Sequence, residues 1–133
     1  MHEKHDQAPQ DLSTLLAGLA DADYCYLTTT GRISGRPHEI EIWFGLRGRA
    51  LYLLSGGGEQ SDWVKNLRVQ PVVRVRIAKY TFKANARIVS DSQEDRLARE
   101  LLDGKYEAWQ PSQPFSEWAQ TALAVALDLE NLV

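Results

Sequence analysis

The residues most suited to binding a charged ligand lie in the segment 55–71, SGGGEQSDWVKNLRVQP. A strand-like run ends there at three glycines, and a short amphipathic helix is predicted to begin at Ser61. Glycines let backbone N–H groups come close to a ligand, and the free N–H groups at the positive end of a helix favour an anion such as phosphate. A glycine-rich turn that only connects a strand to a helix is the commoner case. The segment is therefore a candidate phosphate site, and other features of the sequence have to agree with this interpretation.

Side chains able to perform acid–base or nucleophilic catalysis are few. His2 and His5 lie in a polar N-terminal run, and His38 is the remaining histidine, so a three-histidine metal site in the folded region is excluded. His38 is more simply a strand residue at a surface or cleft. Glu39 and Glu41 share one face of a predicted strand, as an acid–base pair or as solvated charges. No GxSxG motif is present, so demanding chemistry requires a bound cofactor.

Basic residues offer a second candidate contact for phosphate. Arg36 follows a Ser-Gly turn at the start of a predicted strand, and its guanidinium fork is suited to gripping phosphate. Two later strands carry basic side chains on their outward faces: Arg74, Arg76, Lys83 and Arg87. These form either a cationic patch or, as is more common, a solvated face whose charges pair with Glu39 and Glu41.

Composition limits the class of protein. The chain has 133 residues, of which 44% are hydrophobic and 25% charged, and this predicts one globular domain over residues 11–133 after a flexible polar tail, 1–10. The net charge of −3 argues against a nucleic-acid partner. Cys25 is the single cysteine, so a disulfide framework is excluded and a buried, inert thiol is expected. No apolar run reaches a membrane span, and we expect a soluble, cytoplasmic protein without a membrane partner.

The period of the apolar residues predicts the elements that position these candidates. Leucines at helical spacing predict a helix over 12–20, and two more helices are predicted over 61–69 and from Asp91 or Ser92 onward. Alternating patterns predict six strands: 24–30, 36–46, 50–55, 72–78, 81–89 and 122–129. The segment 109–118 is predicted to be a loop with room for one helical turn. The fold class is therefore mainly β with flanking helices, a six-stranded antiparallel sheet curled into a small barrel.

Three segments together resemble a known family: LTTTGRISGRPHEIEIWF, LYLLSGGGEQSDWVKNLRVQPVVRVRI and ARIVSDSQEDRLARELLDGKY. They are similar to the deazaflavin-dependent nitroreductase branch of the flavin-binding split-barrel superfamily, which also contains the pyridoxamine phosphate oxidases. The resemblance covers residues 24–106 and depends on the combination of SGR, SGGG, W-x-x-N-L and P-x-V. It implies a split barrel, a homodimer with the cofactor in a groove near the subunit interface, and hydride transfer to a small electron-poor acceptor such as a quinone or nitroaromatic.

The resemblance also implies roles for particular residues. The phosphate grip would fall on six positions: Arg36, Ser55, Gly56, Gly57, Ser61 and Trp63. The cofactor ring would lie against Thr28 and Thr29 and along the strand formed by Pro37, His38, Ile40, Glu41 and Ile42. Four aromatic residues are candidates for the acceptor side, although packing in the core or at a dimer interface is their more frequent role: Tyr106, Trp109, Phe115 and Trp118.

Asp62 decides between the two cofactors that the superfamily uses. FMN-dependent relatives tend to carry basic residues after the serine that starts the short helix, whereas this chain has Ser61-Asp62-Trp63. Because Asp62 would repel a terminal phosphate, a deazaflavin coenzyme of the F420 type is favoured over FMN. The alternatives are an FMN-dependent oxidoreductase of the pyridoxamine phosphate oxidase-like group, a non-catalytic split barrel that binds flavin or haem, and a cofactor-free structural dimer.

Overall fold

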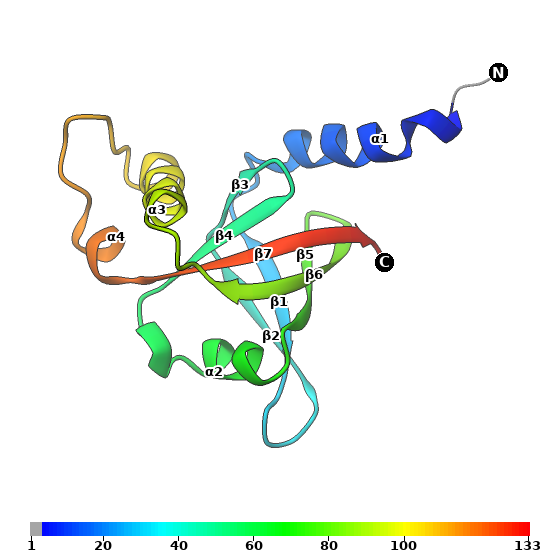
Figure 1. Ribbon diagram of the computed structural model, residues 1–133, viewed down its shortest axis with the longest axis horizontal. Helices are drawn as coiled ribbons and strands as arrows, with labels where there is room; N and C mark the ends of the chain where they lie inside the picture. The colour runs from blue at the N-terminus through cyan, green and yellow to red at the C-terminus, as the bar shows by residue number, and fades with distance from the viewer. Residues whose placement is uncertain (1–3) are drawn as a thin grey trace.

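Seven antiparallel strands form one curled sheet, in the order β2-β1-β5-β6-β7-β4-β3 (Figure 1). The computed structural model describes the backbone of residues 4–133 and the side chains from residue 12 onward. The strands are β1 Cys25–Thr30, β2 Pro37–Ile42, β3 Gly45–Arg47, β4 Ala50–Ser55, β5 Val72–Ile77, β6 Tyr80–Ile88 and β7 Leu123–Leu132. Apart from the number of strands, the sheet agrees with the predicted curled antiparallel class.

The extra strand arises because the predicted strand 36–46 is broken at Trp43 and Phe44. The N–H of Phe44 donates to the hydroxyl of Tyr106 at 3.1 Å, and the chain then pairs with β4 instead of continuing beside β1. β2 and β3 are therefore the two edges of the sheet, joined by only two residues. Since three residue steps span at most about 11 Å, the sheet has to curl until its edges approach each other at this point.

Four α-helices flank the sheet: α1 Lys4–Leu19, α2 Asp62–Val69, α3 Ser92–Tyr106 and α4 Glu117–Thr121 (Figure 1). The predicted N-cap of α3 is confirmed, because the Asp91 carboxylate accepts the N–H of Glu94 at 2.9 Å. Helix α4 begins at Glu117, within the last two residues of the predicted loop 109–118, and continues beyond it to Thr121. Of the predicted polar tail, residues 4–10 belong to α1, and residues 1–3 lie outside the described residues.

Two hydrophobic clusters lie on opposite faces of β4. Leu51 and Leu53 belong to the cluster inside the curled sheet, which also holds Cys25 at 0% exposure. Burial raises the pKa of the Cys25 thiol to about 12, so the predicted inert thiol is confirmed. Tyr52 and Leu54 point to the other side and pack beneath α3 and α4. The alanine face of β7 joins this second cluster, so a helix covers it.

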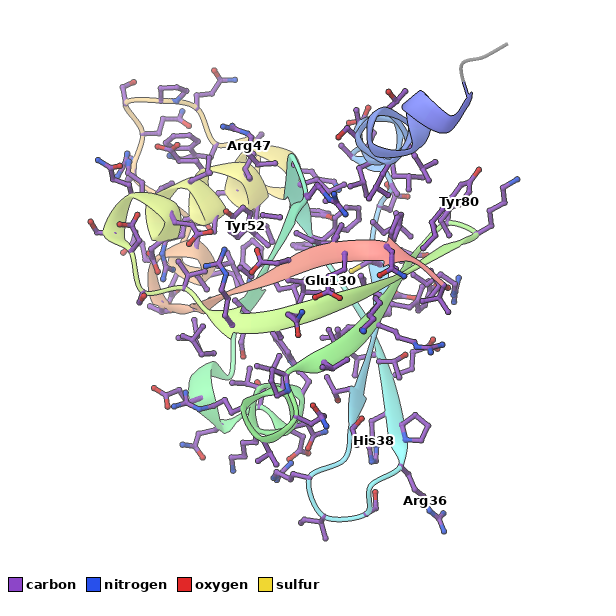
Figure 2. The ribbon with its side chains drawn as sticks, turned by 45° about the vertical axis from the view of Figure 1, so that its right-hand side comes forward. Arg36, His38, Arg47, Tyr52, Tyr80 and Glu130 are labelled. Carbon is purple, nitrogen blue, oxygen red and sulfur yellow. The ribbon has the colours of Figure 1, made fainter. Side chains whose placement is uncertain are left out.

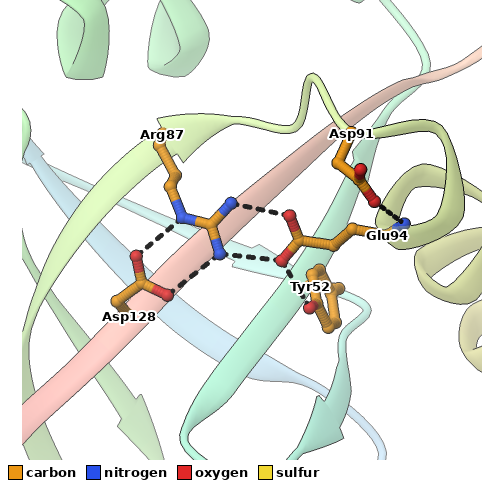
Figure 3. A network of polar contacts seen from close by, with 5 residues as sticks. All are labelled: Tyr52, Arg87, Asp91, Glu94 and Asp128. Carbon is orange, nitrogen blue, oxygen red and sulfur yellow. Dashed lines mark hydrogen bonds and ion pairs between the residues drawn. The ribbon is translucent and has the colours of Figure 1, made fainter.

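The basic side chains of the sheet do not pair as predicted. β1 lies between β2 and β5, which separates Glu39 and Glu41 from the arginines of β5. Within the described side chains, Arg87 instead forms ion pairs with Glu94 and Asp128, both at 2.7 Å, and the hydroxyl of Tyr52 donates to Glu94 (Figure 3). Lys83 faces Glu130 at 3.8 Å and the Arg76 guanidinium lies 4.2 Å above the Tyr26 ring, as part of the same outer surface.

Among residues 4–133, no helix combines the length and apolar character that crossing a bilayer would require.

Candidate functional site

A cavity of about 480 Å³ lies between the β1–β2 hairpin and the first turn of α2. Eleven residues line it: Thr29, Gly31, Arg32, Ile33, Ser34, His38, Glu39, Ile40, Asp62, Trp63 and Asn66. Both of the sequence features proposed to hold phosphate contribute to it, since one wall comes from the GRISGR turn and the other from the helix after the glycines. We call it the hairpin cavity.

The hairpin turn is shaped by its two glycines. Gly35 has φ of +73°, a conformation that side chains rarely adopt, and its N–H donates to the carbonyl of Gly31 at 2.8 Å. A Cβ on Gly31 would lie 2.6 Å from Nε2 of His38, so the missing side chain makes room for the imidazole. Ser34 Oγ lies 3.4 Å from the same nitrogen. His38 is thus fixed against the turn at the cavity wall, and Figure 2 shows Arg36 directed away from the molecule.

Asn66 connects α2 to the hairpin. Its Oδ1 accepts the N–H of Arg32 at 3.1 Å and the guanidinium Nη1 at 2.8 Å, while its Nδ2 donates to the hydroxyl of Thr29 at 3.1 Å. Asn66 and Thr29 are only 4% and 2% exposed. Because buried polar groups are costly when unpaired, this set of bonds fixes the hairpin to the helix.

Arg32 places a positive charge in the hairpin cavity. Its guanidinium contacts the Asp62 carboxylate at 3.2 Å, and the arginine side chain is 26% exposed whereas that of Asp62 is 86% exposed. The negative charge that disfavours a terminal phosphate at the helix start is therefore accompanied by a cation. Arg32 supplies this cation in the hairpin cavity, and the phosphate contact predicted for Arg36 stays a prediction.

The glycine loop is held by its serines. Ser55 Oγ lies 2.8 Å from Ser61 Oγ and donates to the carbonyl of Gly58 at 2.9 Å. A Cβ on Gly57 would lie 2.5 Å from Ser61 Oγ, so a larger residue there would displace the serine hydroxyl. Ser61 precedes α2, yet its side chain forms no capping bond to the helix. The first turn of α2 lines the hairpin cavity without a side-chain cap, an arrangement that an anion would complete.

A second cavity of about 330 Å³ continues along β2. Its lining residues are Glu41, Ile42, Trp43, Leu54, Glu107 and Trp118. The two cavities meet the strand at consecutive residues, Ile40 and Glu41. The Trp43 ring is 5.4 Å from Trp118, nearly perpendicular to it, and lies parallel to Tyr106 at 4.3 Å. We call this second space the tryptophan cavity.

The last turn of α3 supports the tryptophan cavity from behind. The Tyr106 hydroxyl accepts the N–H of Phe44 and donates to the carbonyl of Asp23 at 2.7 Å, and burial raises the pKa of Tyr106 to about 12. Lys105 Nζ donates to the carbonyls of Ala20 and Phe44 and lies 3.8 Å from the Phe44 ring centre. Its burial lowers the pKa of the ammonium group. These contacts fix the two residues that join β2 to β3.

The structure brings six of the predicted site residues to the two cavities and leaves the others outside. Those that line a cavity are Thr29, His38, Ile40, Glu41, Ile42 and Trp63. Those outside are Thr28, Arg36, Pro37, Ser55, Gly56, Gly57 and Ser61. Thr28 is the register partner of Glu39 on β2 and lines neither cavity. The cofactor contacts predicted for these residues stay predictions.

Several residues that line the cavities were not predicted from the sequence as site residues, among them Arg32, Trp43, Asn66 and Glu107. Arg32 has the same glycine-turn setting as Arg36, and its bonds to Asn66 and Asp62 on α2 distinguish it. Of the predicted acceptor-side aromatics, Trp118 lines the tryptophan cavity and Tyr106 supports it, whereas Trp109 and Phe115 contact each other at 5.1 Å. Among the described residues, no group of histidine, cysteine and carboxylate side chains is arranged to hold a metal.

Comparison with solved structures shows the fold. The chain superposes on a provisionally named 5-nitroimidazole antibiotic resistance protein from Bacteroides thetaiotaomicron with a TM-score of 0.71 and 16% identity, over 90% of this chain and 81% of that one. A provisionally named pyridoxamine 5'-phosphate oxidase from Listeria innocua gives 0.68 and 18%, over 90% and 94%. An F420-H2 dependent reductase, FDR-A, gives 0.62 and 16%, over 79% and 93%. The predicted split barrel is thereby confirmed.

A family model describes nearly the whole chain. Residues 5–129 match the F420H(2)-dependent quinone reductase family, while no curated protein matches the sequence. The family's reductant is a reduced deazaflavin, which confirms the predicted deazaflavin cofactor and the oxidoreductase class. The hairpin cavity is compatible with such a cofactor, because it combines the Arg32 guanidinium with an uncapped helix start. The match over residues 5–129 shows that the chain belongs to the F420H(2)-dependent quinone reductase family.

Proposed function

We propose that this protein transfers hydride from reduced F420 to a small, flat, electron-poor acceptor such as a quinone or a nitroaromatic. The observation that carries the proposal is the pair of cavities that follow one another along β2. The hairpin cavity is lined by polar, charged and apolar side chains, with Arg32 beside the carboxylates of Glu39 and Asp62, and it includes a helix start suited to an anionic group. The tryptophan cavity is mostly apolar and aromatic, as suits a flat acceptor.

In this proposal the side chains bind and orient, and the bound cofactor supplies the hydride. Arg32 and the first amides of α2 hold the anionic part of the cofactor, and Asn66 keeps Arg32 in place. Ile40 and Ile42 provide an apolar surface along β2, which keeps water from the reacting groups. Trp43 and Trp118 contact the acceptor. No side chain has to act as an essential acid or base.

Support for these acceptors comes from two sides. The family to which the chain belongs is named for quinone reduction. One structurally similar protein carries a name that refers to 5-nitroimidazole resistance, and a nitroimidazole is a flat, electron-poor ring of the size that the tryptophan cavity can take. We therefore extend the acceptor class to nitroaromatics.

We also propose a homodimer, as the resemblance of the sequence implies. Large apolar side chains lie on the surface of the single chain, including Ile33 at 90% exposed and Val69 at 67% exposed. A subunit interface would remove such side chains from water. Sedimentation equilibrium of the purified protein tests the proposal, and a mass of one 15.0 kDa chain at all concentrations contradicts it.

Turnover tests the proposed function directly. Reduced F420 is mixed with the protein and with menadione or a 5-nitroimidazole, and oxidation of the cofactor is followed by its returning absorbance and fluorescence. We expect protein-dependent oxidation with both acceptors and none when FMNH2 replaces reduced F420. If the protein binds F420 tightly but never accelerates its oxidation, it is a carrier of the cofactor. If it binds neither F420 nor FMN, the proposed function is wrong.

A further inference from the structure

The charged residues that line the tryptophan cavity have the same sign. Of its six lining residues, Glu41 and Glu107 are acidic, and the other four are apolar or aromatic. Both glutamates are exposed, and each lies beside an aromatic or apolar wall. A flat ligand entering this space meets carboxylates and tryptophan rings together.

Glu107 is the less compensated of the two acids. It is the C-cap residue that follows α3, and its backbone N–H donates to the carbonyl of Asp103 at 2.9 Å. Among the side chains of residues 12–133, no cation lies in ion-pair contact with it. Lys105 is two residues away, but its ammonium group is engaged with backbone carbonyls and the Phe44 ring.

Glu41 is partly compensated. The nearby Glu41 carboxylate raises the pKa of the Tyr26 hydroxyl, and the Arg76 guanidinium lies over the Tyr26 ring at 4.2 Å. The electrostatic effect of Glu41 on a ligand is therefore weaker than that of Glu107. The two residues rank in a definite order, which an experiment can check.

The aromatic walls act in the same direction as the carboxylates. Trp43 is 41% exposed, and the electron-rich face of an indole attracts cations more strongly than other aromatic rings do. An anion in this cavity would meet two carboxylates and two indoles with no lining cation to offset them. Resting on the proposed function, we propose that the tryptophan cavity selects flat acceptors that carry a positive charge over neutral and anionic acceptors of the same shape.

The charge preference leaves the chemistry of the acceptor unchanged. A naphthoquinone that carries a quaternary ammonium group on a short tether gains two electrons and two protons to become the hydroquinone, and reduced F420 loses them. The positive charge stays on the tether throughout, so it contributes to binding and not to the electron balance. A tethered sulfonate and an uncharged tether give the matched anionic and neutral compounds with the same quinone ring.

The test compares kcat/KM for these three quinones at saturating reduced F420. We expect the cationic quinone to exceed the neutral one by about fivefold and the anionic one by more than tenfold at low salt, and the differences to shrink as salt screens exposed charges. Glu107→Gln should lower the cationic-to-neutral ratio by about threefold, and Glu41→Gln by less. Glu117→Gln serves as the control, because Glu117 lies next to Trp118 in sequence but does not line the cavity.

Two outcomes overturn the inference: a cationic-to-neutral ratio near one, or a ratio that Glu107→Gln and Glu117→Gln change equally. If none of the three quinones is reduced, the proposed function fails instead. Quenching of tryptophan fluorescence then still gives the dissociation constants of the three compounds. A cation that binds no more tightly than the sulfonate would overturn the charge preference independently of turnover.

Discussion

The Arg32 side chain bonds to α2 and also lines the hairpin cavity, where we propose that the cofactor binds. Its backbone N–H and guanidinium both bond to Asn66, which is almost fully buried, while the same guanidinium reaches Asp62. A side chain held at three points loses little further freedom when a ligand arrives, so ordering it costs little on binding. This is the physical reason to prefer Arg32 over the exposed Arg36 as the cation of the cofactor site.

Replacing each arginine with alanine separates the two candidates. We expect Arg32→Ala to raise the dissociation constant of F420 at least tenfold, because a hydrogen bond between charged groups contributes about 1.5–3 kcal/mol. Arg36→Ala should have a smaller effect, since Figure 2 shows its side chain directed away from the molecule. Fluorescence titration of F420 measures both, with thermal unfolding as the control for folding. If Arg36→Ala binds F420 as tightly as the unmodified protein, Arg36 does not contact the phosphate. If Arg32→Ala does so, Arg32 is not the cation that binds the cofactor.

Local patterns in the sequence predicted most of the secondary structure and only part of the site. The alternation of Val73, Val75 and Ile77 predicted β5 correctly, because one face of that strand is buried. The break at Trp43 and Phe44 accompanies a hydrogen bond to Tyr106, which lies 62 residues beyond Phe44. No residue near Phe44 in the sequence predicts this break. The choice between two arginines in one turn depends in the same way on a distant partner.

At the scale of elements, the last turn of α3 acts as a support for the edges of the sheet. It bonds to the β2–β3 junction through Tyr106 and Lys105, and to the end of α1 through the carbonyl of Ala20. Three segments distant in sequence meet there. Since Trp43 lies in this junction and lines the acceptor cavity, the support also fixes the wall of the site.

Two substitutions of Tyr106 separate two of its contacts, the ring stacked on Trp43 and the hydroxyl bonded to the backbone N–H of Phe44. Tyr106→Leu removes the ring stacked on Trp43, and we expect the KM for the acceptor to rise by about threefold to tenfold, since such aromatic pairs contribute about 0.5–1.5 kcal/mol. Tyr106→Phe keeps the ring but leaves the N–H of Phe44 unpaired, so it should lower the unfolding free energy by about 1 kcal/mol with little change in KM. Steady-state kinetics at saturating reduced F420 and urea unfolding measure these effects. Equal KM values for both variants would contradict the positioning role.

At the scale of the whole molecule, one network of ion pairs and hydrogen bonds holds α3 to three strands, β4, β6 and β7. Arg87 from β6 holds Glu94 of α3 and Asp128 of β7, and Tyr52 from β4 donates to the same Glu94 (Figure 3). The hydrogen bond and charge of Arg87, followed by the hydroxyl of Tyr52, lower the pKa of Glu94 to about 2. The folded protein therefore favours ionised Glu94 more strongly than the unfolded chain does.

This network makes stability depend on pH in a predictable direction. The folded-state pKa of Glu94 is depressed, so its contribution is complete above the ordinary value of 4.5 and is lost as the pH falls toward 2. We expect Glu94→Gln to lower the unfolding free energy by about 1–2 kcal/mol at pH 7, a value reduced by the solvent exposure of Arg87, and to lower it less at pH 3. Urea unfolding at both pH values measures the difference. Glu100→Gln, which removes an exposed helical pair with Arg96, is the control, and an equal effect of pH on both variants would contradict the assignment.

The burial of Cys25 matters for an enzyme whose proposed acceptors include quinones. Quinones are electrophiles that arylate thiolates, and the thiolate is the reactive form of cysteine. The one cysteine of this chain is fully enclosed between strands, with a pKa of about 12, so it is neither ionised near neutral pH nor accessible to a passing acceptor. The fold thereby protects the thiol from the proposed quinone acceptors, and prolonged exposure to benzoquinone at neutral pH should give no mass adduct on Cys25, whatever forms on amines.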